Sequence, residues 1–292
     1  MVIPREPDSP DIGSTGTDST FSAGRLAWLG SLGNVRNVVR QELISRQLDR
    51  HLPTAPARIL DVGAGQGTQS IRLARAGHRV LAIEPDPAMR AAFTDALDTE
   101  PATVQDRVGL RAGSLGRLGA VTAGATYDAV LLLGVLMYLE TSEPVITELA
   151  AHVAPCGLLA LAARTTISAL WRPAARQDWQ AALAAFAEYE QARAEGRDMR
   201  YLNEIGALAR ADDLGALTTS TARHGLTLEN WYGVRIAVDM AELDPPPPSD
   251  PAELAALLAV EEWLGATDPF RHLGQLAHVI LRRSGQASAD VA

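Results

Sequence analysis

The chain contains no lysine, and all 26 of its basic residues are arginine. Acidic residues outnumber them, which gives a net charge of −9 at pH 7. Proteins that bind nucleic acid neutralise phosphates with clustered cations, and no arginine-rich stretch occurs in this sequence. The overall charge therefore disfavours a nucleic acid as a partner, although it leaves a local basic groove open.

Cysteine and long apolar segments are also scarce. The single cysteine, Cys156, excludes an internal disulfide, which fits a reducing compartment and favours the cytoplasm. The longest apolar run, 129–139, is too short for a membrane span and favours a buried strand. We therefore expect no membrane association, and no basic flank with an apolar stretch marks a signal peptide. No group of His, Cys or Asp residues has metal-ligand spacing, so we expect no metal.

Residues 58–84 carry the strongest signal: an apolar strand, a glycine loop, a helix and a second strand that ends in an acid. Arg58–Val62 is short and apolar enough for a buried strand, and a helix is expected from Thr68. The glycines allow a tight turn and a close approach to a ligand, whose anionic part the first helical amides can hold. Glu84 lies about 20 residues beyond the first glycine, as an acid that binds ribose hydroxyls would. The pattern predicts a nucleotide-type cofactor site at the carboxyl edge of a parallel sheet.

The spacing of the glycines separates two classes of cofactor. The dinucleotide pattern has two residues between its second and third glycines, whereas here only Gln66 separates Gly65 from Gly67. Asp61 precedes Gly63 at the end of the strand, so the motif is D-x-G-x-G-x-G. This motif, followed by a strand that ends in an acid, resembles the class I S-adenosylmethionine (SAM) methyltransferases. The resemblance implies that the cofactor is SAM.

The rest of the chain continues the alternation of strands and helices. Periodicity predicts helices and strands, with a turn between two of them at Pro155-Cys156-Gly157. The helices are expected at 34–52, 145–153 and 251–264, and the further strands at 127–134, 158–162, 228–238 and 276–282. Together with a third strand that the resemblance implies before Ser114, they predict an α/β, Rossmann-like sheet of seven strands, mostly parallel, with helices on both faces. The resemblance implies that the last two strands pair antiparallel at one edge.

Composition and periodicity divide the chain into five segments. The first is rich in Pro, Asp, Ser, Thr and Gly, a composition typical of disorder. The third is mostly helical, and the resemblance implies that this insertion after strand five forms a lid over the cofactor. The segments are a disordered tail (1–20), a SAM-binding core (21–164), a helical insertion or acceptor lid (165–226), C-terminal strands and a helix completing the core (227–283), and a tail (284–292).

A closer resemblance, to the tRNA 5-carboxymethoxyuridine methyltransferases, extends from about residue 24 to residue 283. Two departures concern the substrate: the basic run that those enzymes carry in the insertion is missing, and an alanine-rich helix with Glu188, Glu190 and Glu195 is present. The resemblance thus bears on the chemistry more than on tRNA as the acceptor. The matching positions include Arg40-Gln41, Gly77-His78, Gly134-Val135-Leu136, Gly233-Val234-Arg235 with Asp239, and Leu273-Gly274.

The resemblance also implies a set of cofactor contacts. Arg40 would reach the methionyl carboxylate of SAM, and Glu84 would take the ribose hydroxyls. Ser114 and Leu115 would flank the adenine, while Asp61 either contacts the cofactor or caps the following turn. Leu133 occupies the position where the tRNA enzymes carry histidine, so only the backbone groups of Leu133 and Gly134 are expected to line the site there. The candidate cofactor residues are Arg40, Asp61, Gly63, Ala64, Gly65, Gly67, Glu84, Ser114, Leu115, Leu133 and Gly134.

The acceptor site is less well marked. No obvious general base follows the fourth strand, where Met137 and Tyr138 stand. A carboxylate acceptor is already ionised near neutral pH and needs no base, whereas a hydroxyl acceptor usually requires a nearby His, Asp or Glu to take its proton. Arg235 and Asp239 either form a structural ion pair, or Arg235 grips an anionic acceptor bidentately. The catalytic residues stay unassigned, and the acceptor-pocket candidates are Tyr138, Trp171, Tyr201, Tyr232, Arg235 and Asp239.

The resemblance thus leads us to expect a SAM-dependent methyltransferase that acts on a small or modest-sized acceptor at oxygen and releases S-adenosylhomocysteine (SAH). Within the same class, the alternative is a wobble-uridine carboxyl methyltransferase acting on tRNA, which the net charge of −9 disfavours. Outside that class, a SAM-binding protein without transfer activity and an NAD-dependent oxidoreductase stay open. The sequence does not indicate the oligomeric state.

Overall fold

The computed structural model describes residues 26–203, 206–241 and 243–285. The tail expected at 1–20, and all but two residues of the one expected at 284–292, lie outside the described residues. A seven-stranded sheet forms the centre, in the order β3-β2-β1-β4-β5-β9-β8, and β9 runs in the opposite direction to the other six strands. The strands are β1 Arg58–Val62, β2 Arg79–Glu84, β3 Val108–Ala112, β4 Tyr127–Leu133, β5 Val153–Arg164, β8 Leu226–Val234 and β9 Leu276–Arg283.

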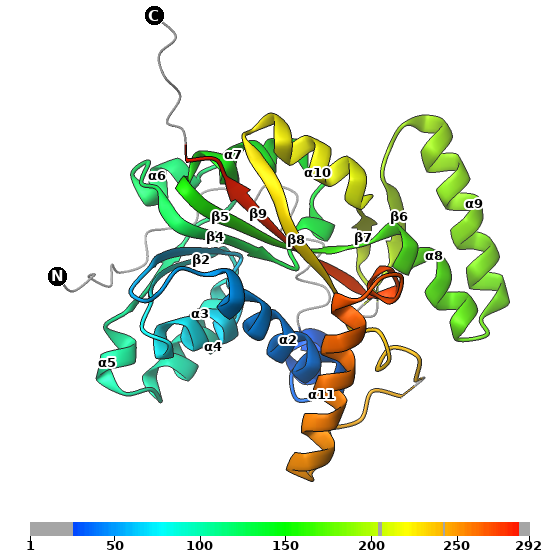
Figure 1. Ribbon diagram of the computed structural model, residues 1–292, viewed down its shortest axis with the longest axis horizontal. Helices are drawn as coiled ribbons and strands as arrows, with labels where there is room; N and C mark the ends of the chain where they lie inside the picture. Colours follow the sequence, from blue (N-terminus) through cyan, green and yellow to red (C-terminus); the bar gives the residue numbers. More distant parts are fainter. Residues whose placement is uncertain (1–25, 204–205, 242, 286–292) are drawn as a thin grey trace, which may run out of the picture.

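Helices cover both faces of this sheet (Figure 1). One face carries α2 Val35–His51, α3 Thr68–Arg75, α4 Pro87–Asp98, α5 Ala102–Gln105 and α11 Pro251–Ala266. The other carries α6 Leu118–Thr122, α7 Glu143–Ala151 and α10 Leu214–Arg223. Within the described ranges, no helix combines the length and the apolarity that a membrane span needs.

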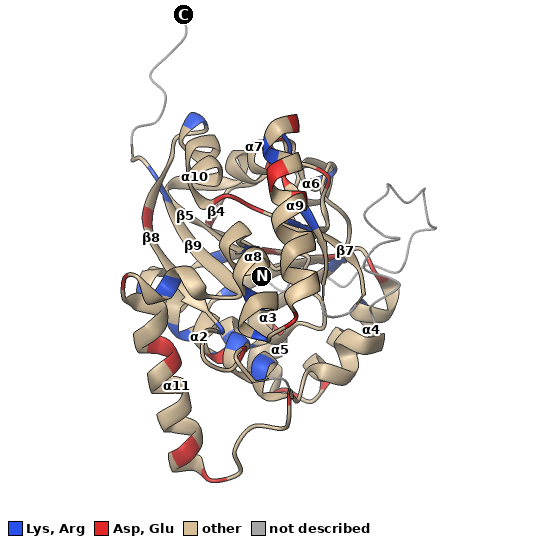
Figure 2. Ribbon diagram, turned by 90° about the vertical axis from the view of Figure 1, so that its right-hand side faces the viewer, with Lys and Arg blue, Asp and Glu red and all other residues tan. Residues whose placement is uncertain are grey.

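After β5, the chain leaves the sheet through two helices, α8 Thr166–Ala175 and α9 Trp179–Glu195, and a hairpin, β6 Met199–Leu202 and β7 Leu208–Ala211. Figure 2 views the molecule from this end, with α9 in front. The sequence predicts a mostly helical insertion, and it does not predict the hairpin that the structure shows. Its strands are four residues each, too short for an alternating pattern to stand out in the sequence.

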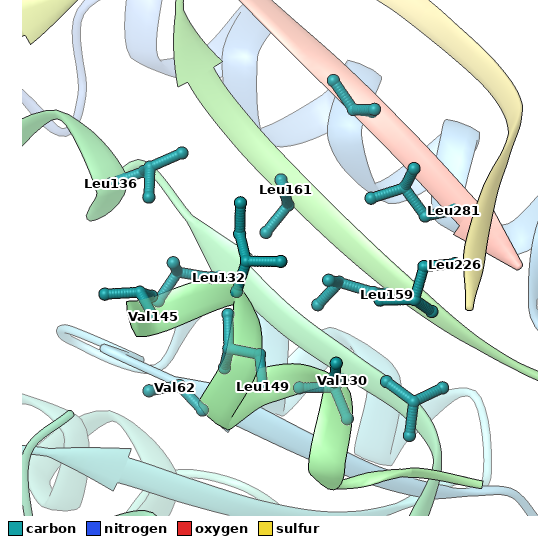
Figure 3. Packing of buried hydrophobic residues seen from close by; sticks show 14 of the residues in the cluster. Val62, Val130, Leu132, Leu136, Val145, Leu149, Leu159, Leu161, Leu226 and Leu281 are labelled. Carbon is teal, nitrogen blue, oxygen red and sulfur yellow. The ribbon is translucent and has the colours of Figure 1, made fainter. Parts of the chain in front are cut away.

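Alternating side chains of the central strands build two separate cores. In β4, Val130 and Leu132 face α7, whereas Ala129 and Leu131 pack on the side of α2. Figure 3 shows the first core, where Leu132 and Leu149 of α7 meet Leu161 of β5. Both cores are fully enclosed, so the central strands are held rigidly and their ends become fixed positions for functional groups.

Two expected boundaries differ from the structure. Strand β5 runs without a break from Val153 to Arg164, so Pro155-Cys156-Gly157 lies inside a strand rather than in a turn before one. The register with β4 shifts at this point, and Cys156 has a φ of 60°, so the expected turn is a bulge. Strand β8 ends at Val234 instead of 238, because Arg235 adopts a φ of 65°, outside the extended region.

Candidate active site

A cavity of about 420 Å³ follows the edge of the sheet where the parallel strands end. Strands β1, β2, β4, β5 and β8 all finish at this edge, and the antiparallel β9 begins there. Leu276, the first residue of β9, pairs with both Arg164 and Val234. The cavity extends from Glu84, at the end of β2, to Arg235, just beyond β8. One continuous space thus connects the glycine loop with the far edge of the sheet.

The glycine loop forms one wall of this cavity. Gly63 has a φ of 69°, and a side chain there would collide with Val135 on the loop after β4. Gly67 is the N-cap residue of α3 and has a φ of 85°. It packs against the ring of Phe93, so a Cβ atom at this position would collide with that ring. Gly67 does not line the cavity, so it shapes the turn and permits close packing rather than facing a ligand.

Glu84 is held by two backbone groups at the end of β2. The N–H of Gly65 donates to Oε2 at 2.7 Å, and the N–H of Asp86 donates to Oε1 at 2.9 Å. Burial nevertheless raises the pKa of this carboxyl group to about 7, because only 5% of the residue is exposed. A ligand that donates hydrogen bonds to the ionised carboxylate would offset this cost, as ribose hydroxyls would.

A second buried acid, Asp61, lies at the end of β1. Ser70 of α3 donates its hydroxyl to Oδ2 of Asp61 at 2.6 Å, so the carboxyl group ties the strand to the helix. Burial raises its pKa to about 6. Asp61 also lines the cavity, so both interpretations of the sequence, contact with a ligand and support of the turn, are compatible with its position.

Arg40, on α2, reaches across to the end of β4. Its Nη2 donates to the carbonyl oxygen of Leu133 at 3.0 Å, and its guanidinium carbon lies 4.9 Å from the ring centroid of Trp28. Gly134 follows with a φ of 85°, and a Cβ atom there would collide with the same guanidinium. The glycine therefore makes room for a buried cation in the middle of the cavity.

The structure brings ten of the eleven candidate cofactor residues together, and Gly67 is the exception. The candidates that line the cavity are Arg40, Asp61, Gly63, Ala64, Gly65, Glu84, Ser114, Leu115, Leu133 and Gly134. They come from α2 and from the ends of β1, β2, β3 and β4. The common edge of the strands accounts for this convergence.

Arg235 and Asp239 form a buried ion pair. Nε of Arg235 lies 2.8 Å from Oδ2 of Asp239, and Nη2 lies 2.9 Å from Oδ1, so one edge of the guanidinium is directed at the carboxylate. Of the two interpretations of the sequence, the ion pair is the one whose contacts the structure shows. Arg235 also lines the cavity, whereas Asp239 lies behind it.

The aromatic candidates for the acceptor pocket separate into two groups. Tyr138 lines the cavity, and Asn203 donates from Nδ2 to its hydroxyl oxygen at 3.3 Å. The other three are not among the lining residues, and each has another contact. Trp171 donates from Nε1 to a backbone oxygen, Tyr201 stacks under Arg164, and Tyr232 lies 2.8 Å from His51. The sequence named them as pocket candidates without giving the direction of their side chains.

Comparison with known proteins agrees with this geometry. Residues 60–161 match a family model described as a methyltransferase domain. Residues 60–161 are therefore a methyltransferase domain, and they lie within a fold of the class I SAM-dependent type. The matched segment begins in β1 and ends in β5, so it contains the glycine loop, Glu84 and the strand ends at the cofactor side of the cavity.

Solved structures resemble the methyltransferase over most of its length. Magnesium protoporphyrin IX methyltransferase from Synechocystis PCC 6803, with bound SAH, is 16% identical, with a TM-score of 0.57 over 92% of this chain and 98% of that one. The 1,6-didemethyltoxoflavin-N1-methyltransferase from Burkholderia thailandensis, also with SAH, is 16% identical, with a TM-score of 0.52 over 94% and 93%. At this identity the likeness is one of fold, and it confirms the Rossmann-like architecture expected from the sequence.

A curated relative matches a shorter stretch of the methyltransferase. Hemagglutinin 1 of Eikenella corrodens is 29% identical over 105 residues, which is 35% of this chain. The matched stretch spans about a third of the length of that relative, 33%. This similarity therefore concerns one segment and not a whole protein.

The structure adds cavity residues that the sequence had not singled out. Four of them lie at the end of the cavity away from the glycine loop: Arg36, Arg164, Asn203 and Gln275. Arg36 precedes Arg40 by one helical turn, so the same face of α2 presents both, and i, i+4 spacing could have indicated it. Arg164 ends β5, a position that strand-end reasoning also favours. Asn203 follows the unexpected strand β6 and had no signal in the sequence.

Proposed function

We propose that the methyltransferase transfers the methyl group of SAM to an oxygen atom of a small or modest-sized acceptor. The supporting observation is a single cavity that joins the glycine loop and Glu84 to a compartment lined by Tyr138, Asn203 and Gln275. Its volume of about 420 Å³ lies within the range of small-molecule sites. When bound, SAM supplies an electrophilic methyl group for an in-line displacement.

The described residues fit SAM by their chemistry. The buried carboxylate of Glu84 would accept hydrogen bonds from the ribose hydroxyls, and Arg40 would hold the methionyl carboxylate. Ser114 and Leu115, on the loop after β3, would flank the adenine. This order would follow the strand ends from β2 and β3 to β4.

An acceptor that is already ionised suits the composition of the cavity. Among the described residues that line it, none is a histidine, and three of the four acids, Asp61, Glu84 and Asp86, lie at the cofactor end. The fourth, Asp244, accepts the backbone N–H of Arg36 at 3.1 Å. Because a carboxylate needs no base to act as a nucleophile, we favour it over a hydroxyl as the attacked group.

The relatives also support a small acceptor. The two solved structures named above are methyltransferases named for 1,6-didemethyltoxoflavin and for magnesium protoporphyrin IX, both small molecules. Transfer to tRNA stays an alternative, because Gly233-Val234-Arg235 resembles the tRNA 5-carboxymethoxyuridine methyltransferases. The net charge of −9 disfavours it, because it would repel the phosphates of RNA. Helix α11 carries three glutamates and no arginine, and its acidic turns are visible in Figure 2.

We further propose the division of the chain made from the sequence, with residues 165–226 as an acceptor lid on the SAM-binding core. Support comes from Asn203, which follows β6 in this segment and lines the cavity beside Tyr138. Helix α9 packs on α8 through Ala192, which lies in a cluster with Ala169, Met199 and Ala211, so the insertion keeps its own small core.

Incubation with methyl-labelled SAM tests the proposal. We expect label to be transferred to components of a small-molecule extract of the source cells and not to total tRNA. A Glu84→Ala variant serves as the control. It lacks the carboxylate that would accept hydrogen bonds from the ribose hydroxyls of SAM, so it should lose the transfer. Label in tRNA alone would replace the proposed acceptor class, and no label in either sample would overturn transfer activity. Titration with SAH and NAD adds a binding test, in which tight NAD binding without SAH binding would contradict SAM as the cofactor.

A further inference from the structure

The loop between β3 and α6 carries Ser114 and Leu115, which line the cavity and are proposed to flank the adenine of SAM. Residues 114–117 form a tight turn, in which the N–H of Arg117 donates to the carbonyl oxygen of Ser114 at 3.3 Å. The third residue of this turn, Gly116, has a φ of 85°, which favours glycine. Ser114 and Leu115 are thus the first half of one turn, and their position depends on where its second half is held.

Helix α7 holds the second half of this turn through the side chain of Glu148. The N–H of Gly116 donates to Oε2 of Glu148 at 2.6 Å, and the N–H of Leu118 donates to Oε1 at 2.8 Å. Both oxygens of one carboxylate are therefore bound to backbone groups of the loop. Hydrogen bonds from an N–H group to a carboxylate are stronger than those to a neutral acceptor, so this contact is suited to fixing the loop.

The two ends of the loop are fixed by packing, whereas its middle is not. Gly113 fits so closely that a Cβ atom there would lie 3.0 Å from the side chain of Ile83, and Leu118 is fully buried. In the part of the chain that the structure describes, Glu148 is the only side chain that forms a hydrogen bond with the backbone of residues 113–117. The place of the turn in the cavity wall thus depends on this one carboxylate.

Helix α7 gives the contact a rigid support. Its residues Ile146 and Leu149 are fully buried in the first core, and Figure 3 shows Leu149 among the side chains that fill it. Because such a core is closely packed, the helix presents the carboxylate at a fixed place. Glu148 itself is half-buried and does not line the cavity, so it can act on a ligand only through the loop.

From these contacts we infer that Glu148 is a positioning residue of the cofactor site, which holds the turn 114–117 where Ser114 and Leu115 flank the adenine of SAM. The inference rests on the proposed methyltransferase function and adds to it a residue outside the cavity. A loop that is already held in its binding position loses less conformational freedom when the ligand binds, which raises the affinity. The competing assignment is a purely structural one, in which the carboxylate supports the start of α6 and has no effect on the binding of the base.

Two fragments of SAH separate the base from the rest of the cofactor and test the inference. Adenosine keeps the base and lacks the amino acid part, whereas S-ribosylhomocysteine keeps the amino acid part and lacks the base. Displacement of methyl-labelled SAM gives the dissociation constants of SAH and of both fragments. The measurement is made on the unmodified protein and on a Glu148→Gln variant, whose amide offers one acceptor oxygen to the two N–H groups.

We expect the dissociation constants of SAH and adenosine to rise about tenfold in Glu148→Gln, which corresponds to about 1.4 kcal/mol. The dissociation constant of S-ribosylhomocysteine should stay within about twofold, because this ligand has no base to contact the loop. Unchanged binding of this fragment also shows that the variant folds.

Three further variants are matched to this measurement. Glu148→Asp keeps two acceptor oxygens and should recover part of the loss. Glu143→Gln makes the same change on the same helix, but the carboxylate of Glu143 contacts Ser220 and His224 of α10, so this variant should match the unmodified protein. Gly116→Ala displaces the turn by a second route, because a side chain disfavours the φ of 85°, and it should weaken SAH and adenosine in the same way.

The outcomes separate the inference from the function on which it rests. Unchanged SAH binding in Glu148→Gln would show that the turn keeps its place without the carboxylate. Equal losses for SAH and both fragments would assign Glu148 to the general stability of the fold. Either result would refute the inference and leave the methyltransferase function standing. An unmodified protein that binds neither SAH nor adenosine would contradict SAM as the cofactor, and the inference would fail with it.

Discussion

Binding of SAH should depend on pH through Glu84. Burial raises the pKa of its carboxyl group from 4.5 to about 7, so the group is largely protonated at pH 6 and largely ionised at pH 8. Ribose hydroxyls donate hydrogen bonds, and the ionised carboxylate accepts them better than the protonated one. Bound ligand thus favours the ionised form, and each pH unit below the pKa should weaken binding tenfold. We expect the dissociation constant to rise about tenfold from pH 8 to pH 6.

The same group sets a second, opposite effect on the free protein. The folded state holds a proton that the unfolded chain releases between pH 4.5 and about 7, so stability should fall as the pH rises through this window. The pKa difference corresponds to about 3 kcal/mol as an upper estimate. Glu84→Gln removes the charge, so the variant without ligand should be more stable than the unmodified protein at pH 8.

Calorimetric titration with SAH between pH 6 and 8, with thermal unfolding of the free proteins, measures both effects. Glu84→Gln should bind SAH more weakly at pH 8 and show a flat pH profile. Asp61, whose pKa burial raises to about 6, would contribute mainly at the acid end of the range. An unmodified protein whose affinity ignores pH, or a Glu84→Gln variant with the same slope, would refute the reasoning.

Three further predictions follow from single contacts. Gly134→Ala should weaken SAH binding about tenfold with a lower melting temperature, because its Cβ would strike Arg40, and unchanged affinity would remove Arg40 from the cofactor site. Asp239→Ala leaves buried arginines without their carboxylate and should cost about 3–5 kcal/mol in urea unfolding; a cost under about 1 kcal/mol would show that water screens them. Leu161→Ala should cost about 2–5 kcal/mol and Leu183→Ala under about 0.5, since the first is fully buried and the second is 61% exposed.

The cofactor side of the molecule could be predicted because its information is local. A buried strand, a turn that requires glycine, a helix and an acid follow one another within 58–84, and parallel pairing alone brings their ends to one edge. The helix beginning after Asn34 was similarly clear, because its apolar residues repeat at helical spacing. The resemblance singled out Arg40, and the structure shows its guanidinium beside the carbonyl oxygen of Leu133.

The other end of the cavity was less predictable, for two physical reasons. Side-chain direction at the end of an element depends on local backbone, and the φ of 65° at Arg235 had no signal in the sequence. Aromatic residues satisfy a core as readily as a pocket, so Trp171 and Tyr232 fitted either role until their hydrogen-bond partners were known. The hairpin that carries Asn203 was hidden by the shortness of its strands.

The group of buried arginines Arg36, Arg164, Arg172 and Arg235 belongs to the same category. Its members come from α2, the end of β5, α8 and the segment after β8, so folding alone brings them together. Each arginine by itself would be interpreted as a solvated surface residue, because the sequence around a single arginine does not show that it is buried. The structure gathers several of them around the buried carboxylate of Asp239. A cofactor common to many enzymes can be bound through a short motif, whereas an acceptor particular to one enzyme is contacted by residues that only the fold brings together.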